Sequence, residues 1–270
     1  MKVVKLEVAA GISPSRTLKM WWWLIGIGQN KEFKIAATWN ELDWKQVRQI
    51  AELLFKSENI YKVKLLLSKI ISRMPMMTFN WLSDDDKLYL SQQVAWATDL
   101  GKLNLTKQLL PKHKGLYGPL DKLSNITIDE FGFADRCFDK YLETKQPDEL
   151  DKLVAILYRK RKRGKVTDGD VRVAFNNHVI EDNARRIKHW KSDVKHGILL
   201  FYWGCRNLIV DVHKERFTKP GPATTASVSK ANWFDIISSM AGGKFGTIEE
   251  TKRVNVWVFM REWVKVGKKG

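Results

Sequence analysis

The stretch from Asn232 to Val264 constrains the fold of this chain more than any other. Asn232 is a candidate N-cap for a short helix whose apolar residues recur at helical spacing, namely Trp233, Ile236, Ile237 and Met240. Ala241-Gly242-Gly243 ends that helix, because Gly accepts the left-handed backbone of a C-cap. Thr247 caps a second helix, which we expect to run on to Val264. The stretch predicts two helices joined by an elbow, and packing is the commoner role of such aromatic stripes.

Composition favours a folded protein, and the caps and apolar spacing along the chain lead us to expect a predominantly α-helical fold with a small extended N-terminal element. Of the 270 residues, 44% are hydrophobic and 12 are Trp, which is enough for a sizeable core without disulfides or metals. Cys137 and Cys205 offer neither a disulfide framework nor metal-ligand spacing. We expect both to be small apolar side chains within helices.

The net charge of +17 is concentrated in the C-terminal half. Residues 151–270 hold 25 Lys and Arg against 12 Asp and Glu, whereas residues 1–150 hold 22 against 18. A basic half of this kind suits nucleic acid or an acidic protein partner. It also suits a merely solvated surface, so charge alone does not decide between them.

We expect three regions: an extended N-terminal element over residues 1–36, a helical region over 37–110 and a basic helical region over 128–270. The intervening 101–127 reads as an irregular connection and a plausible domain boundary. Residues 217–230, rich in Thr, Pro, Gly, Ala and Ser, read as a flexible linker.

Caps and apolar spacing predict the helices. Asn40 is a candidate N-cap for the helix that begins near Trp44, and the adjacent acidic residues after Ser83 suit the first turn of a helix better than a metal site. The remaining expected helices span residues 60–74, 128–143, 147–158, 172–190 and 193–212, the last two being the longest.

Tryptophans mark candidate contacts near the N-terminus. Trp21, Trp22 and Trp23 cannot all face one way on a helix or strand, so at least one meets a second surface. Trp is enriched at protein interfaces, and Trp22, Trp39 and Trp44 are therefore candidate interface residues. The apolar run at 20–27 is too short to span a bilayer, and no secretory signal is recognisable, so we expect no membrane partner and no secretion.

The most concentrated basic run lies at residues 159–165. Its candidate phosphate contacts are Arg159, Lys160, Arg161, Lys162 and Arg163. Such runs occur in nucleic-acid-binding proteins, but between two helices they are more often solvated loops. A nucleic-acid-binding function using this run together with Arg185, Arg186 and Lys188 is the alternative function.

No recognisable catalytic or cofactor motif is present. The five His show no metal-ligand spacing, and there is no phosphate-binding Gly-rich loop or nucleophile elbow. We therefore expect no enzyme activity, cofactor or metal, although a site dispersed in sequence is left open.

Several patches resemble small proteins encoded among phage and prophage tail genes. They are Phe33 to Leu54 with its Trp-Asn-Glu-Leu opening, Leu157-Tyr158-Arg159 with Asp170 to Asn176, Leu200 to Arg206, and Trp233 to Ile248 with the Phe245-Gly246 elbow. The resemblance implies a non-enzymatic, mostly helical virion-assembly protein. It would act as a tail-assembly chaperone or minor structural component that binds another tail protein, in the host cytoplasm or within the virion. The motif residues would be Trp39, Trp44, Trp233, Phe245 and Gly246.

Overall fold

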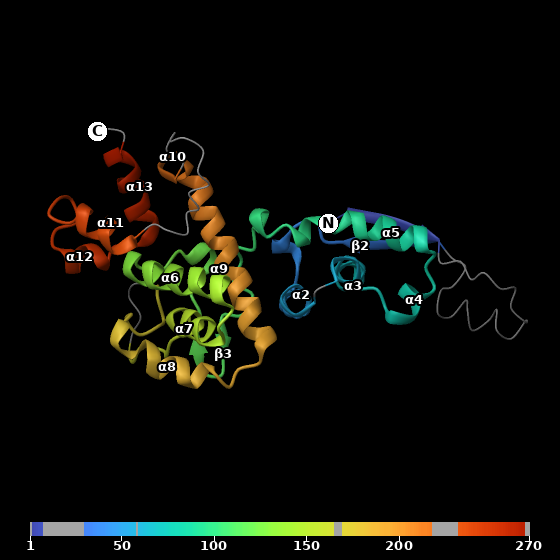
Figure 1. Ribbon diagram of the computed structural model, residues 1–270, viewed down its shortest axis with the longest axis horizontal. Coiled ribbons are helices and arrows are strands. Elements are labelled where there is room, and N and C mark those ends of the chain that lie inside the picture. Colours follow the sequence, from blue (N-terminus) through green and yellow to red (C-terminus); the bar gives the residue numbers. More distant parts are fainter. Residues whose placement is uncertain (1, 8–29, 58, 165–168, 218–231, 268–270) are drawn as a thin grey trace, which may run out of the picture. The chain divides into compact units, whose positions relative to one another are not determined.

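The computed structural model describes residues 2–7, 30–57, 59–164, 169–217 and 232–267. Trp22 and nearly all of the expected linker at 217–230 lie outside these residues. The described chain is mainly α-helical, which confirms the expected fold class, including its small N-terminal strand element (Figure 1). It forms two compact units, Met1–Leu105 and Thr106–Gly270, and the division falls within the expected connection at 101–127.

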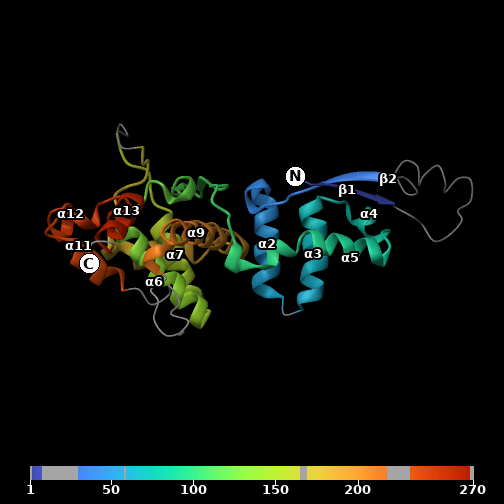
Figure 2. The ribbon, with the colours of Figure 1, turned by 90° about the horizontal axis from the view of Figure 1, so that it is seen from above.

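The first unit combines a strand pair with a group of helices. Strands β1 (Lys2–Glu7) and β2 (Asn30–Ile35) are antiparallel, with Lys2 opposite Ile35. The helices are α2 (Trp44–Lys56), α3 (Ile60–Ser72), α4 (Met76–Asn80) and α5 (Asp84–Gln93), with 3-10 turns at Trp39–Glu41, Ala95–Thr98 and Leu100–Lys102. Helices α2 and α3 lie side by side, and α3 also packs on α5 (Figure 2). Their buried apolar faces form the core of this unit.

Helix starts in the first unit follow the polar caps, with one correction. Ser83 caps α5 through its hydroxyl, which accepts from the Asp86 N–H. The expected N-cap at Asn40 is wrong, because Asn40 lies inside a 3-10 turn. Asp43 caps α2 instead and forms a capping box with Gln46, so each side chain accepts from the other's backbone N–H.

The second unit is built around three helices. These are α6 (Ile128–Thr144), α7 (Pro147–Leu157) and α9 (Ser192–Val212), with α8 (Ile180–Ile187) packed on α7. The C-terminal helices are α10 (Lys214–Phe217), α11 (Trp233–Met240), α12 (Ile248–Lys252) and α13 (Val256–Gly267). Helix α11 packs on α6. This contact places the stretch from Asn232 to Val264, called here the organising stretch, against the central helices.

The elbow after α11 forms as the sequence predicts. Asn232 caps α11, and Thr247 and Glu250 form the capping box of α12. The second helix is not continuous to Val264, however, because it breaks at 253–255 between α12 and α13. At this break Asn255 donates its side-chain amide to the Ser124 carbonyl oxygen, which ties the chain to the segment before α6.

Two expectations for the second unit are wrong. The helix expected at 172–190 is limited to α8, preceded by a 3-10 turn at Asn177–Val179, because residues 171–173 pair with the basic run as extended backbone. The connection at 101–127 is not wholly irregular. It holds a hairpin of β3 (Lys112–His113) and β4 (Leu116–Tyr117) and a 3-10 turn at Asp121–Leu123.

Candidate functional site

The basic run begins in an antiparallel ribbon rather than a solvated loop. Tyr117 and Arg159 exchange both backbone hydrogen bonds, at N···O distances of 2.8 and 3.1 Å. On the other side, Arg161 lies opposite Arg172, held by hydrogen bonds from Lys162 N–H to the Val171 oxygen and from Val173 N–H to the Lys160 oxygen. The hairpin β3–β4 and residues 159–162 and 171–173 therefore form one small ribbon.

One carboxylate organises the inner end of this ribbon. Glu130, in the first turn of α6, is 1% exposed and receives two guanidinium groups. Its Oε1 lies 2.7 Å from Arg159 Nη1 and 2.8 Å from Arg172 Nη1. Asp170 adds a second carboxylate, with Oδ1 2.9 Å from Arg172 Nε. Two buried cations thus meet two carboxylates, the balance that buried charges require.

Arg172 is the most enclosed member of this network. Its side chain is fully buried, and its guanidinium also donates to the Leu157 and Asn125 carbonyl oxygens. Burial acts to lower the pKa of Arg172, but the charges of Glu130 and Asp170 outweigh it and raise that pKa. The guanidinium therefore stays charged and fixes the ribbon to α6.

A polar groove of about 1150 Å³ opens above the network. Its walls come from the segment before α6, residues 174–178 and helix α12; the groove residues on α12 and after it are Glu249, Lys252, Arg253 and Asn255. Asp129 also lines the groove, and burial raises the pKa of its carboxyl group. Glu130 and Asp170 pair with Arg159 and Arg172 beside the groove, so these four groups hold its shape.

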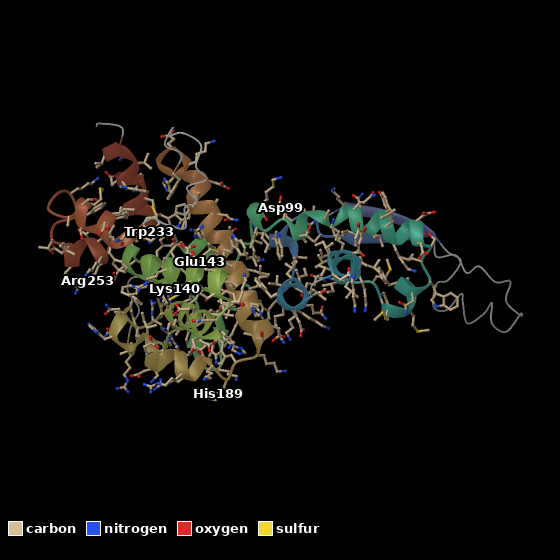
Figure 3. The ribbon with its side chains drawn as sticks, viewed as in Figure 1. Asp99, Lys140, Glu143, His189, Trp233 and Arg253 are labelled. Atoms are coloured by element: carbon tan, nitrogen blue, oxygen red, sulfur yellow. The ribbon has the colours of Figure 1, made fainter. Side chains whose placement is uncertain are left out.

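Trp233 is a packing residue of the organising stretch. It is buried between α11 and α6, and its indole Nε1 donates to Asp135 Oδ2 at 2.7 Å (Figure 3). The other oxygen of Asp135 accepts from the Tyr202 hydroxyl and the Arg206 guanidinium. A Cβ on Gly132 would lie 3.0 Å from the Trp233 Cβ, so a larger residue there would push the two helices apart by a few tenths of an ångström.

The remaining motif residues are also largely structural. Trp39 is buried against Trp96, with ring centroids 5.6 Å apart, and Trp44 is half-buried at the start of α2. The ring of Phe245 stacks on that of Phe259, with ring centroids 5.8 Å apart. Gly246 has a φ of +75°, which favours Gly, and lies directly before the Thr247 cap.

The structure separates the five candidate phosphate contacts. Arg159 is buried in the Glu130 network and does not reach the surface. Lys160, Arg161 and Arg163 are exposed, whereas Lys162 is half-buried and lines the groove. The more distant candidates Arg185, Arg186 and Lys188 are exposed on or just after α8.

Two surface features were not predicted from the sequence. The hairpin places exposed Lys112 and half-buried Tyr117 beside the basic run, and a Lys-Gly pair between two short extended segments was its only local signal. The second feature is a concentration of exposed apolar side chains in the first unit, between residues 60 and 89: Ile60, Tyr61, Met76, Met77, Trp81, Leu88 and Tyr89.

His196 contacts Tyr141 and Ser192, with its Nε2 2.7 Å from the Tyr hydroxyl and its Nδ1 3.2 Å from the Ser hydroxyl, but none of the three lines the polar groove. Within the described ranges, no cluster of three or more His, Cys, Asp and Glu is arranged to hold a metal ion. Among the helices formed there, none has the length and apolarity needed to cross a membrane.

Comparison of the chain with protein-family models, curated proteins and solved structures gave no match.

Proposed function

We propose that this protein is a non-enzymatic binding protein of phage particle assembly, a tail-assembly chaperone or minor structural component that holds another tail protein. The supporting observation is the placement of apolar side chains on the surface of α3, α4 and α5. Scattered exposed apolar residues are ordinary, but seven of the fifteen large ones on the described surface lie within residues 60–89. Such a concentration favours a protein partner.

The residue types suit that role. Met76 and Met77 are exposed at the start of α4, while Phe79 of the same helix is buried. Met adapts its shape to a partner, and Tyr and Trp supply large contact areas at interfaces. On α5, Leu88 and Tyr89 are exposed while Leu90 is buried. Helices α4 and α5 therefore carry more apolar side chains than are buried in the core of the first unit.

The tail-assembly role rests on the resemblance of the sequence patches to phage and prophage tail-gene proteins. Proteins of that kind act by holding or joining other virion proteins. The ion pairs of Glu130 with Arg159 and Arg172 beside the polar groove are consistent with a scaffold, since they tie α6 to the ribbon.

Co-purification with tail proteins tests this function. The chain is co-expressed with a phage tape-measure protein, with and without the substitutions Met76→Lys and Leu88→Lys. We expect retention of the tail protein by the wild type and at least a tenfold loss in the double variant, because two charges would enter an apolar contact.

Gln49→Lys with Gln92→Lys provides the matched control, since both residues are exposed and polar and the same two positive charges are added. The control and the wild type should retain the partner alike, and circular dichroism checks that all variants fold. Absence of retention by the wild type, or equal retention by the Met76 and Leu88 variant, would overturn the proposal.

A further inference from the structure

The hairpin β3–β4 presents its residues in a fixed register. Lys114 and Gly115, the two residues of its turn, have φ values of 44° and 80°. Positive φ at both positions is typical of the two-residue turn that joins tightly twisted strands, and Gly takes this conformation without strain. Lys112 therefore lies directly opposite Tyr117, and Tyr117 lies opposite Arg159 in the next strand.

This register brings two exposed cations to one side of the ribbon. Directly opposite residues share a face, and so do residues two apart on one strand, so Lys112, Tyr117, Arg159 and Arg161 belong to one face, on which Arg159 is buried while Lys112 and Arg161 are exposed. The Lys112 Nζ lies 5.1 Å from the centroid of the Tyr117 ring. A hydrogen bond from Lys112 lowers the pKa of the Tyr117 hydroxyl, and the charges of Lys112 and Arg161 lower it further against the opposing effect of desolvation.

The ribbon carries two groups of cations, called here its inner end and its outer end by the burial of their side chains, although Arg161 and Arg172 are directly paired along the backbone. At the inner end, Arg159 and Arg172 are buried and balanced by Glu130 and Asp170. At the outer end, Lys112 and Arg161 are exposed and converge on a neutral phenol instead. Further exposed cations border this end, namely Lys114, Lys160 and Arg163. The outer end therefore carries an excess of positive charge that the inner end does not.

We infer that the outer end of the ribbon, defined by Lys112, Tyr117 and Arg161 and called here the cationic ribbon end, binds the phosphate backbone of a single-stranded nucleic acid. Lys and Arg supply the phosphate contacts, and the guanidinium of Arg161 can donate two hydrogen bonds to one phosphate. The half-buried Tyr117 adds a phenol hydroxyl donor and an aromatic edge for an unpaired base. This activity goes beyond the proposed holding of a tail protein, which uses the first unit.

Fluorescence anisotropy of the full-length chain with a fluorescein-labelled single-stranded DNA of about 20 nucleotides tests the inference, at roughly 50 and 200 mM salt. We expect binding at the lower salt that weakens steeply at the higher. Lys112→Ala combined with Arg161→Ala should weaken binding at least tenfold. It should also reduce the dependence of log K on log salt by about 1.4, or about 0.7 for each lost contact.

Arg136→Ala combined with Lys140→Ala is the matched control, because it removes one Arg and one Lys that are exposed on α6 of the same unit. This control should change the affinity less than twofold. Equal losses in the two double variants would show unspecific attraction to the net charge and overturn the inference. Failure of the wild type to bind at the lower salt would also overturn it.

Labelled polyglutamate and duplex DNA separate the remaining partners. We expect single-stranded DNA to bind more tightly than either. Tighter binding of polyglutamate would assign the cationic ribbon end to an acidic protein and contradict the inference. Preference for the duplex would contradict the single-stranded part of it.

Discussion

The two units place charged and apolar side chains in opposite ways. Every buried charged side chain whose surroundings are described belongs to the second unit, including Glu130, Asp135 and Arg172. The buried polar residues described in the first unit are uncharged, namely Gln46, Ser68, Ser72 and Thr78. The first unit instead carries the concentration of exposed apolar residues at 60–89.

The two units therefore differ both in the contacts that stabilise them and in the side chains that they expose. In the second unit, ion pairs between elements far apart in the sequence fix the ribbon and helices, and unmatched cations remain outside. In the first, amphipathic helices bury one face, and part of the apolar surplus faces solvent. The comparison therefore predicts that internal charges matter most to the second unit and that the two units recognise partners by different physics.

Removal of Glu130 should have the largest effect on stability. Glu130→Ala leaves Arg159 and Arg172 buried with less than their matching charge, and breaking a buried pair in this way costs about 3–5 kcal/mol. Urea denaturation followed by near-UV circular dichroism measures the loss. Glu249→Ala, which removes an exposed partner of Lys252, should cost less than about 1 kcal/mol. If both variants lost similar free energies of unfolding, the Glu130 network would not be a main source of stability in the second unit.

A side chain at Gly246 should have a smaller effect. Its φ of +75° disfavours other residues, and an added Cβ would meet Glu250 Oε2 within the α12 capping box. We expect Gly246→Val to lower the free energy of unfolding by about 1–3 kcal/mol. Gly243→Val is the control, because a Cβ there meets no atom within 4 Å. If both variants melt at the temperature of the wild type, the elbow has no special backbone requirement.

Substitution of Asp139 should have the smallest effect on stability, and this effect should depend on pH. Burial, followed by the charge of Asp135, raises the pKa of the Asp139 carboxyl to about 7, although Arg206 opposes the shift. A raised acid pKa means that stability is lost as pH rises from about 4 to about 7, since the folded state then holds an unfavourable charge. Asp139→Asn should therefore stabilise the protein by about 1–2 kcal/mol at pH 8 and by almost nothing at pH 4.

Thermal melts at the two pH values measure this difference. Asp99→Asn, on an exposed residue, should give no comparable pH-dependent gain. A gain of the same size at both pH values would show that the Asp139 substitution acts through something other than its charge.

Local signals in the sequence predicted most helices. The cap at Ser83, the proline at the start of α7 and the apolar spacing of α9 are short-range features, and each gave its helix within a few residues. The capping box of Thr247 and the stop after Met240 were predictable in the same way.

The incorrectly predicted helix at 172–190 and the Glu130 network both depend on contacts between residues that are far apart in the sequence. The segment at 172–190 has helical spacing, but backbone pairing with the basic run takes its first residues. Glu130 precedes Arg159 by 29 residues and Arg172 by 42, and no periodicity connects them. The basic run could be identified as basic, but the burial of Arg159 depends on its contact with the distant Glu130, whereas Arg161, two residues further on, stays exposed.

A salt titration of both partners tests the contrast between the units most directly. Retention of the tape-measure protein and anisotropy of labelled single-stranded DNA are measured on the same full-length protein between roughly 50 and 200 mM salt. Apolar contact depends little on screening, whereas phosphate contact depends strongly on it. The account predicts nearly constant retention of the protein partner and a steep loss of DNA binding. A parallel fall of both, or DNA binding that is insensitive to salt, would contradict it.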